Sequence, residues 1–397
     1  MRLTFLGDVM LDNHQLSKYN TITGYGFDYA FHELKKVIEN SDFVVANLET
    51  PIAAEEKGFT NEEFSFNSPK EFAAALKEAG VHLVTTANNH CLDRGTDGLK
   101  DTLDALDSCG LLHLGTHWKK EKSYLIVEIE GIRVGMVAFT YGTNAFSNHQ
   151  YLNKDQKYMV DMFQEQELAN PLLRKMYLGQ QVPCKAIRKL SRCVGLGQFR
   201  IPIYERREKV KPYLSNLKKA IIDCRSDGAD LIIACLHIGG QYNDEPLAYT
   251  KEICRQSLDA GADAVIANHE HVIHGIDTFL NDKKFCIYSL GNLLSSNGVT
   301  KEPFDRQAEF SAGVNMDIGR NIDGTISVKY SFRLFNSVES TWGRVKCEPL
   351  FYTIQNCIDL RRQKKLIAIN NELVNRILGT KEIEYPLQEE YHIPVIE

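Results

Sequence analysis

Side chains of the types that bind metal ions follow apolar runs at five places in this sequence. They are Asp8 after FLG, Glu49 after VVANL, Asn89 after TTAN, His237 after IACL, and the pair His269 and His271 after VIAN. Strand ends in an α/β sheet converge on one edge, where ligands usually bind. Caps and turns could explain one such ending, but they explain five poorly. The sequence therefore predicts a metal site built from these six residues.

The mixture of carboxylate and imidazole groups indicates which ions could bind. Such ligands suit borderline divalent ions such as Zn, Mn, Fe or Ni, whereas an oxygen-only set would favour Mg or Ca. A carboxylate shared by two ions would hold them about 3.5–4 Å apart, an arrangement that suits displacement at phosphorus. His269 and His271 are two residues apart, so on extended backbone both side chains face the same way. We expect one or two divalent ions, with Mn, Zn or Fe foremost.

The elements that must position these residues alternate between short apolar runs and longer amphipathic stretches. Runs rich in Val, Ile and Leu predict buried strands, and apolar spacings of three and four predict helices. Strand and helix alternate to about residue 115 and hairpin-like strands follow, so mixed α/β layers are expected rather than a pure parallel barrel. The predicted strands are LTFL, FVVAN, HLVTTA, LIVEI, RVGMVAF, LIIACL, AVIAN and FCIYSL, and the predicted helices span residues 27–40, 68–80, 95–110 and 246–261.

The segment from about 145 to 220 interrupts this alternation and is interpreted as an insertion. Residues 171–220 hold 13 Lys and Arg against 2 Glu, a local net charge of +11. Such a run is either a solvated helical excursion or a cationic cap that attracts an anionic substrate or polymer. Beyond residue 305 two closing strands are expected, followed by a polar helical tail over about 353–378. We assign 1–345 to one domain that contains the insertion and 346–397 to a C-terminal helical extension.

The bulk composition excludes several classes of protein. A net charge of −6 argues against a protein that coats nucleic acid along its whole surface, so no specific nucleic-acid partner is expected. Ten cysteines form no C-x-x-C pair, and free, buried thiols are expected. No window is apolar enough for a transmembrane helix and the start has no leader pattern, so a cytoplasmic location is expected unless a leader or anchor was removed. The oligomeric state is left open.

Six motifs together resemble a known family. FLGDVML, ANLETPI, NNHCLDRG, LHIGGQY, ANHEHV and YSLGN lie in order within residues 4–294. They are similar to the CapA/PgsA family, the bacterial capsule and poly-γ-glutamate synthesis proteins, within the calcineurin-like metallophosphoesterase superfamily. The resemblance implies a four-layer α/β/β/α sandwich, here with an inserted, partly helical basic segment. It places a one- or two-metal site at the strand ends.

The resemblance also implies a role for each residue of the site. Asp8 and His271 would bind the first metal and Glu49 would bridge, while Asn89, His237 and His269 would bind the second. His90 would be the catalytic residue that stabilises the transition state or protonates the leaving group. Substrate-binding or supporting positions would be Asn47, Asp93, Arg94, Tyr242 and Asn292.

Three departures from the family pattern affect these expectations. Many phosphoesterases of the superfamily place a His two residues after the first Asp, where this chain has Met10. The first metal would therefore lack one ligand unless Asp12 or His14 replaces it. The usual H-W-G is HIGG, and the usual G-H-P-H is NHEH, so Glu270 puts a charge where Pro is common. That change could alter loop rigidity and pocket charge.

Three functions remain open at this point. The first is a metal-dependent hydrolase that cleaves a phosphate ester with a metal-bound hydroxide. The second is a non-hydrolytic component of capsule or poly-γ-glutamate assembly that binds an anionic polymer, which Met10 and the basic segment would favour. The third is a metal-dependent γ-glutamyl amide hydrolase, since the same nucleophile could cut an amide. The expected partner is in each case a small anionic or a polyanionic substrate.

Overall fold

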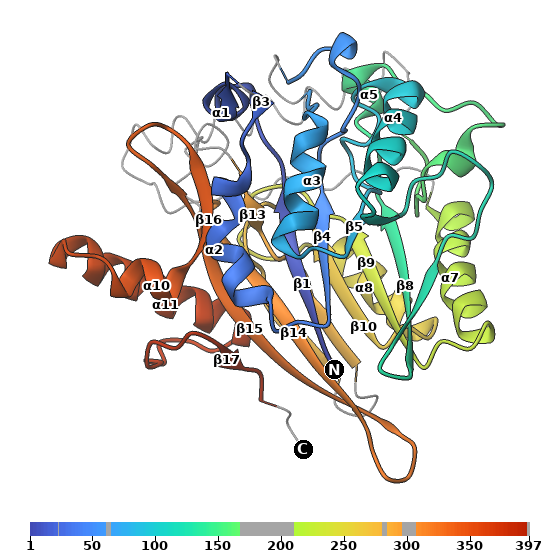
Figure 1. Ribbon diagram of the computed structural model, residues 1–397. Coiled ribbons are helices and arrows are strands. Elements are labelled where there is room, and N and C mark those ends of the chain that lie inside the picture. The colour runs from blue at the N-terminus through green and yellow to red at the C-terminus, as the bar shows by residue number, and fades with distance from the viewer. Residues whose placement is uncertain (23, 61–64, 167–209, 280–283, 296–306, 395–397) are drawn as a thin grey trace, which may run out of the picture.

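The computed structural model describes residues 1–394 except 23, 61–64, 167–209, 280–283 and 296–306. Most of the basic segment 171–220 therefore lies outside the described residues. Within the described part, two sheets of nine and six strands pack face to face (Figure 1). A short two-stranded ribbon joins β2 (Asn20–Thr21) to β3 (Gly24–Tyr25).

The larger sheet is parallel around β1 and antiparallel toward the C-terminal strands. Parallel pairing joins β1 to β4 and β13 and continues to β5 and β6, whereas β14, β15 and β16 are antiparallel. Its strands in spatial order are β16 (Val345–Pro349), β15 (Ile326–Glu339), β14 (Phe310–Arg320), β1 (Arg2–Val9), β4 (Phe43–Leu48), β5 (Leu83–Thr85) and β6 (Leu112–Leu114), with β13 (Asn292–Leu294) on β1 and β17 (Tyr391–His392) on β15.

The smaller sheet has parallel strands in its centre and an antiparallel strand at each edge. A hairpin links its edge strand to the next one, as the sequence predicts for residues 123–140. The strands in spatial order are β11 (Ile276–Phe279), β12 (Lys284–Ile287), β10 (Ala264–Asn268), β9 (Leu231–His237), β8 (Ile132–Thr140) and β7 (Leu125–Ile129).

Helices cover the outer faces of both sheets, which confirms the predicted four-layer α/β/β/α sandwich. One helical layer packs on the larger sheet through residues such as Phe31, Phe72 and Leu106. The other packs on the smaller sheet through residues such as Leu217 and Ile253. The first layer contains α2 (Asp28–Ile38), α3 (Lys70–Ala79) and α4 (Gly95–Ser108), and the second contains α7 (Lys211–Ser226) and α8 (Ala248–Asp259).

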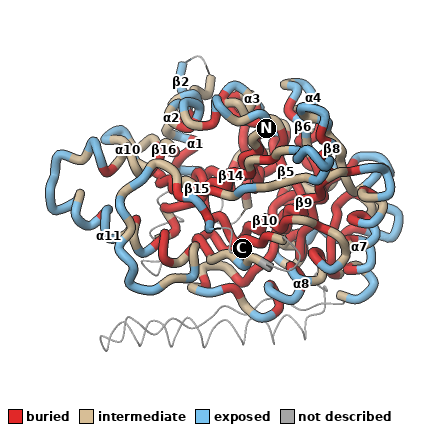
Figure 2. Tube along the Cα trace, turned by 90° about the horizontal axis from the view of Figure 1, so that it is seen from below, coloured by how far each residue is buried: buried red, intermediate tan, exposed pale blue. Residues whose placement is uncertain are grey.

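Strand alternation explains why the sheets are buried on both sides. In β1, Leu3 and Phe5 enter the core between the sheets, whereas Leu6 enters the core under the helices. The two faces of a strand alternate residue by residue, so a strand covered on both sides reads as an unbroken apolar run. Figure 2 shows the resulting buried centre, with exposed residues on the outer helices.

The C-terminal elements close the open side of the sandwich beside β15. Leu350 of α10 (Leu350–Gln355) and Leu373 of α11 (Leu360–Leu378) belong to the core between the sheets. Asp359 caps α11 by accepting from the amides of Arg361 and Arg362, so the predicted tail helix is divided into two. In the described part of the chain, three strands (β14, β15 and β16) precede the tail helices instead of the expected two, because the short β16 is held in place by β15 rather than by its own apolar pattern. The two-residue β17 follows the helices.

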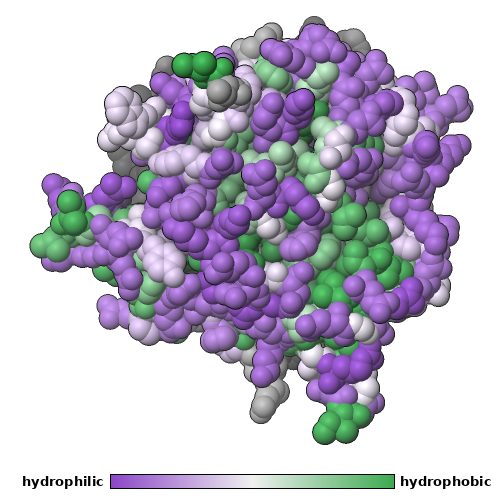
Figure 3. Space-filling view, viewed as in Figure 1, coloured by the Kyte–Doolittle hydropathy of each residue, from purple (hydrophilic) through white to green (hydrophobic). Residues whose placement is uncertain are grey.

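The remaining short elements and the surface complete the molecule. The described cysteines are free thiols. No helix within the described ranges is long and apolar enough to cross a membrane. The face in Figure 3 is mainly hydrophilic, as expected when the large apolar side chains lie inside. The short elements are α1 (Asn13–Tyr19), α5 (Ala145–Asn148) and the 3-10 turns η1 (Glu55–Lys57) and η2 (Lys157–Met159).

Candidate metal centre

The strand register of the larger sheet aligns polar residues around Asp8. Asp8 lies opposite Asn47 of β4 on one side and opposite Asn292 of β13 on the other. Gly7 makes this close approach possible, because a Cβ atom there would come within 2.0 Å of the carbonyl oxygen of Gly291. The side-chain amide of Asn47 donates to Oδ1 of Asp8 at 2.7 Å. The end of β1 is therefore held on both sides by the neighbouring strands.

The smaller sheet supplies the imidazoles from the ends of two neighbouring strands. His237 is the last residue of β9 and lies opposite Asn268, the last residue of β10. His269 and His271 follow β10 with backbone φ values of +105° and +59°. Residues other than Gly rarely adopt positive φ, and such strained residues cluster at ligand sites. These strand ends thus bring the three imidazoles toward Asp8.

Two overlapping groups of buried side chains could hold a metal ion. One contains Glu49, His269 and His271, and the other contains Asp8, Glu49 and His237, with the ligand atoms of each group within 4.8 Å of one another. Asp8 and Glu49 have no exposed surface, and the imidazoles are 2–3% exposed. The groups divide the ligands differently from the family-based assignment, but Glu49 is shared by both. A shared carboxylate is the arrangement that bridging requires.

Asn89 lies at the same point as the charged ligands. Its Oδ1 is 2.6 Å from Nε2 of His237, and that nitrogen is 3.3 Å from Oε1 of Glu49. On the other side of the ring, Nδ1 of His237 is 3.2 Å from the side-chain amide nitrogen, Nδ2, of Asn47. The structure therefore brings together all six residues that the sequence predicts as metal ligands.

Glu49 is the least satisfied polar group of the centre. Among the described residues, neither of its carboxylate oxygens accepts a well-aligned hydrogen bond, although the residue is fully buried. Its nearest charged partners are the imidazoles of His237, at 3.3 Å from Oε1, and of His271, at 3.9 Å from Oε2. A buried carboxylate normally needs hydrogen bonds, an ion pair or a metal ion. The donor set around it, two carboxylates and three imidazoles, suits a divalent transition-metal ion. These residues therefore fit the cation that the family resemblance implies.

The charges of the centre are strongly coupled. Burial opposes ionisation of Glu49, but His271 and His237 outweigh it and lower the pKa of Glu49 to about 2. Burial likewise opposes protonation of His271, yet Glu49 and Asp8 raise the pKa of His271 to about 9. For Asp8, burial and then the negative charge of Glu49 raise the pKa. Positive charge at this point is thus favoured by both carboxylates.

His90 is held beside the cluster by a carboxylate. Its Nδ1 is 2.7 Å from Oδ2 of Asp93, and Oδ2 also accepts from the amide of Phe66 at 2.8 Å. The Phe66 ring packs edge-on against the imidazole, with centroids 4.5 Å apart. His90 directly follows the candidate ligand Asn89, and its charge helps to lower the pKa of Glu49. Asp93 therefore fixes the orientation of a ring that could act on a bound substrate.

Of the remaining predicted supporting residues, Asn292 and Tyr242 lie beside His271, whereas Arg94 bonds to another loop. Oδ1 of Asn292 lies 2.9 Å from Nδ1 of His271 and orients that ring, and the Tyr242 ring lies 5.3 Å from the His271 ring. Burial and then the charges of Glu49 and Asp8 raise the pKa of Tyr242. Arg94 instead donates to the carbonyl of Gly58 and to the hydroxyl of Ser65.

The structure also shows what surrounds Met10. Met10 is buried at the end of β1, and its amide donates to the carbonyl of Leu294. Asp12 caps α1 by accepting from the amide of Gln15, and His14 is exposed on that helix. In the described part of the chain, the two buried ligand groups include neither Asp12 nor His14.

Two polar residues that shape the centre were not predicted as site residues, although Glu270 was noted as a charge in place of Pro. Asn88 donates to the carbonyl of Leu48 at 2.7 Å and accepts from the amide of His90, so it fixes the turn that carries Asn89 and His90. Its position inside TTANNH was a usable signal. Glu270 is fully buried and joins two loops of the centre, a connection that depends on residues distant in the sequence.

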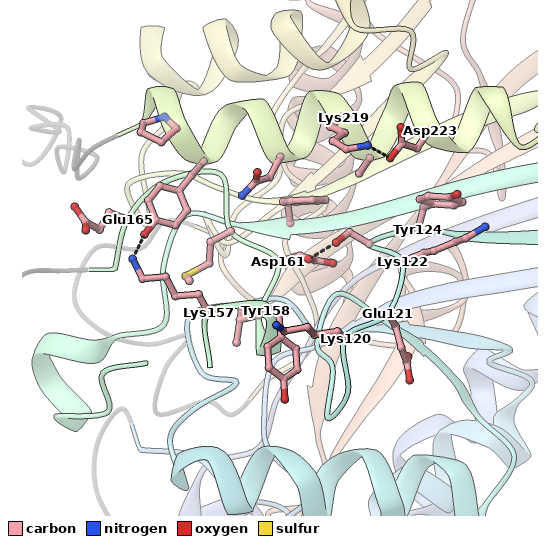
Figure 4. Close-up of a pocket in the computed structure, with 18 residues that line it drawn as sticks. Lys120, Glu121, Lys122, Tyr124, Lys157, Tyr158, Asp161, Glu165, Lys219 and Asp223 are labelled. Carbon is pink, nitrogen blue, oxygen red and sulfur yellow. Dashed lines mark hydrogen bonds and ion pairs between the residues drawn. The ribbon is translucent and has the colours of Figure 1, made fainter. Parts of the chain in front are cut away.

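A separate cavity of about 850 Å³ lies between α7 and the loops around residues 120 and 160 (Figure 4). The predicted ligands do not line it. Several of its polar side chains are bonded to one another or to close neighbours: Lys157 donates to Tyr213, Lys219 pairs with Asp223, and Ser123 donates to Asp161. We therefore place the candidate centre at the strand ends and not in this cavity.

Comparison with known proteins supports the family resemblance. The capsule biosynthesis protein CapA of Bacillus anthracis is 27% identical over 306 residues, which cover 76% of this chain and 61% of that protein. The PGA biosynthesis protein CapA of Bacillus subtilis (strain 168) is 24% identical over 306 residues, covering 75% of this chain and 64% of that protein. The chain thus spans less than two thirds of the length of both relatives.

A solved structure and a family description complete the comparison. The crystal structure of a hypothetical protein from Thermus thermophilus aligns with 88% of this chain and 98% of its own, at 15% identity and a TM-score of 0.37. The family described as bacterial capsule synthesis protein PGA_cap matches residues 2–297. Since that range covers most of the chain and contains every predicted ligand, the chain belongs to this family.

Proposed function

We propose that the chain is a metal-dependent hydrolase that cleaves a phosphate ester. The observation that carries the proposal is Glu49, a fully buried carboxylate whose oxygens accept no well-aligned hydrogen bond among the described residues and face Asp8 and three imidazoles, all of them metal-ligand types. A structural acid would be satisfied by protein donors. An acid kept without them, beside other ligand types, is suited to a cation.

One or two divalent ions, with Mn, Zn or Fe foremost, would be held by Asp8, Glu49, Asn89, His237, His269 and His271. When bound, they would supply Lewis-acid catalysis and a water nucleophile at neutral pH. Asn47 holds Oδ1 of Asp8, and Asn292 orients His271, so both ligands keep their direction. These contacts support a preorganised site.

The proposed catalytic residue is His90. Its Nδ1 is bound to Asp93, which leaves Nε2 as the nitrogen for substrate. From that position the imidazole would donate a proton to the leaving oxygen or stabilise charge on the phosphoryl group. Asp93 would keep the ring in one tautomer and one orientation.

The test is hydrolysis of aryl phosphate mono- and diesters by protein loaded with Mn, Zn or Fe. We expect metal-dependent turnover, and we expect Asp8→Ala and His237→Ala to lose both metal and turnover. His90→Gln should keep the metal and lower kcat by about 10²–10⁴-fold. Metal-dependent turnover retained in both Asp8→Ala and His237→Ala would overturn the proposal.

A second candidate is a non-hydrolytic role in capsule or poly-γ-glutamate assembly, in which the chain binds an anionic polymer. It is favoured by the names of the Bacillus relatives, a capsule and a PGA biosynthesis protein. Binding of polyglutamate at low salt, without turnover of any ester, would favour this role. Hydrolysis of γ-glutamyl peptides but not of esters would instead indicate an amide hydrolase.

A further inference from the structure

Glu270 lies between two candidate ligands, yet its carboxylate is bound to a different loop. The residue has no exposed surface. Its Oε1 accepts from the amide of Gly240 at 2.9 Å and from the side-chain amide of Asn243 at 3.3 Å. Its Oε2 accepts from the backbone amide of Asn243 at 3.2 Å. Three donors therefore hold this carboxylate, in contrast to that of Glu49.

The loop that Glu270 holds has an unusual backbone. Gln241 and Tyr242 have φ values of +71° and +57°, so two successive residues with side chains are left-handed. Such a backbone conformation is strained for a residue with a side chain and persists only when its surroundings fix it. The amide of Tyr242 donates to the backbone carbonyl of Glu270 at 2.7 Å. Side chain and backbone of Glu270 thus act on the same few residues.

Gly239 provides independent evidence that the loop is built around Glu270. Its φ is +146°, and a Cβ atom there would come within 2.6 Å of Cγ and 2.7 Å of Oε1 of Glu270. The side chain of Glu270 therefore occupies the space that any other residue at position 239 would need. The pair is mutually dependent, since the Gly makes room for the acid and the acid bonds the next residue.

The two loops joined in this way carry the three imidazoles of the centre. The loop 238–243 follows His237 directly, and Glu270 separates His269 from His271. The same loop carries Tyr242, whose ring lies 5.3 Å from that of His271 at an angle of 37°. A change in the connection would shift imidazoles from two strands relative to each other, and it would move the aromatic wall beside them.

We propose that Glu270 is the positioning residue of the centre: it connects the loop after β9 to the loop after β10 and thereby sets the relative geometry of His237, His269 and His271. This inference rests on the proposed metal-binding function. Glu270 is not a ligand in it, because its oxygens are engaged by Gly240 and Asn243. Its two oxygens accept from two backbone amides and one side-chain amide at once.

The test compares Glu270→Ala, Glu270→Gln and Gly239→Ala with Glu390→Gln as matched control, since Glu390 is also largely buried and hydrogen-bonded but lies beside β15. Affinity is measured by titrating each metal-free protein with Mn²⁺ alone. We expect Glu270→Ala and Gly239→Ala to lose about 10–100-fold in affinity, the usual range for residues that orient ligands. Glu270→Gln should recover part of the loss, and Glu390→Gln should lose none.

Hydrogen exchange of the metal-free proteins gives a second measurement that needs no ion. Amides of Gly240 and Asn243 should exchange at least about tenfold faster in Glu270→Ala, while those of β9 keep their protection. Unchanged exchange at both amides, or unchanged Mn²⁺ affinity in folded Glu270→Ala, would overturn the inference. Failure of the phosphate-ester proposal would give a different result. The wild type would then show no turnover, but Glu270→Ala would still lower the Mn²⁺ affinity and speed amide exchange.

Discussion

Each end of β1 carries a charged residue, and the charges beside these two residues differ in sign. Arg2 lies beside opposite charges, whereas Asp8 lies beside a like charge. At the first end, Arg2 pairs with Asp317 at 2.7 Å and with Glu390 at 3.1 Å. At the other end, Asp8 lies beside Glu49, a second negative charge. One end of the strand thus neutralises its charges within the protein. The other gathers like charges and leaves a place for a cation.

The two glutamates at these ends show the difference most clearly. Oε1 of Glu390 accepts from Ser331, and Oε2 accepts from Arg333 at 2.9 Å. The oxygens of Glu49 accept no well-aligned hydrogen bond in the described part of the chain and face the imidazoles of His237 and His271, at 3.3 and 3.9 Å. Burial alone therefore does not distinguish the two acids. Well-aligned hydrogen bonds satisfy Glu390, whereas Glu49 faces groups that are themselves metal-ligand types.

The largest effect is expected from Glu49→Gln, which removes the shared carboxylate. Loss of a ligand should exceed the 10–100-fold loss typical of orienting residues, so affinity for Mn²⁺ should fall more than about 100-fold. At a free-ion concentration of 100 times the wild-type Kd, the wild type gains about 2.7 kcal/mol of stability from the ion, but a 100-fold weaker variant gains only about 0.4 kcal/mol. Thermal unfolding with and without the ion measures both. An equal gain in the two proteins would contradict the role of Glu49.

A smaller effect on the same end is expected from Asn292→Ala. This change removes the oxygen that lies 2.9 Å from Nδ1 of His271, so the ring loses its fixed direction. Affinity for Mn²⁺ should fall about 10–100-fold. Asn315→Ala is a matched control, because Asn315 is a buried amide of the same sheet that accepts from Thr4 instead. Equal loss of metal affinity in both variants would show that general destabilisation is responsible.

The opposite end should respond in stability and not in metal affinity. Glu390→Gln weakens charge-assisted bonds to Arg333 and Arg2, and we expect the free energy of unfolding to fall by about 1–3 kcal/mol. Urea unfolding of metal-free protein measures this change. Mn²⁺ affinity should equal that of the wild type. A loss of affinity here would mean that the two ends of β1 are coupled.

The smallest effect is the pH dependence of that contribution. Burial opposes ionisation of Glu390, but bonds from Ser331 and Arg333 and the charge of Arg2 outweigh it and lower its pKa from 4.5 to about 2. A depressed folded-state pKa means that this stability is fully present above pH 4.5 and is lost as the pH falls through about 2. The difference between wild type and Glu390→Gln should therefore shrink between these pH values. A difference that stays constant would exclude the ionised carboxylate as its source.

Much of the fold could be predicted from the sequence because its strands are covered on both faces. Such strands are unbroken apolar runs, and two of them, β7 and β10, span the same residues as the runs LIVEI and AVIAN. The four predicted helices are confirmed, and α3 ends where Gly80 adopts the left-handed conformation. The short β16 was missed because its pairing with β15 is a tertiary effect.

The candidate ligands could be predicted from the sequence, but the loop contacts of Arg94 and Glu270 could not. Asp8, Glu49 and the histidines follow strands, so the convergence of strand ends was enough to bring them together. The directions of Arg94 and Glu270 depend on loops distant in the sequence, at Ser65 and at Asn243. No local pattern encodes those contacts. For the same reason the sequence alone could not show that Glu49, among the described residues, accepts no well-aligned hydrogen bond while Glu270 accepts three.

We infer that the Asp8 end of β1 holds a divalent ion through Glu49. The most direct measurement is the metal content of the purified protein by elemental mass spectrometry, after removal of metal with a chelator, reloading with Mn, Zn or Fe, and dialysis. The wild type should retain one or two ions per chain, Glu390→Gln should retain the same number, and Glu49→Gln should retain fewer or none. Equal metal content in wild type and Glu49→Gln, or no retained ion in the wild type, would contradict the account.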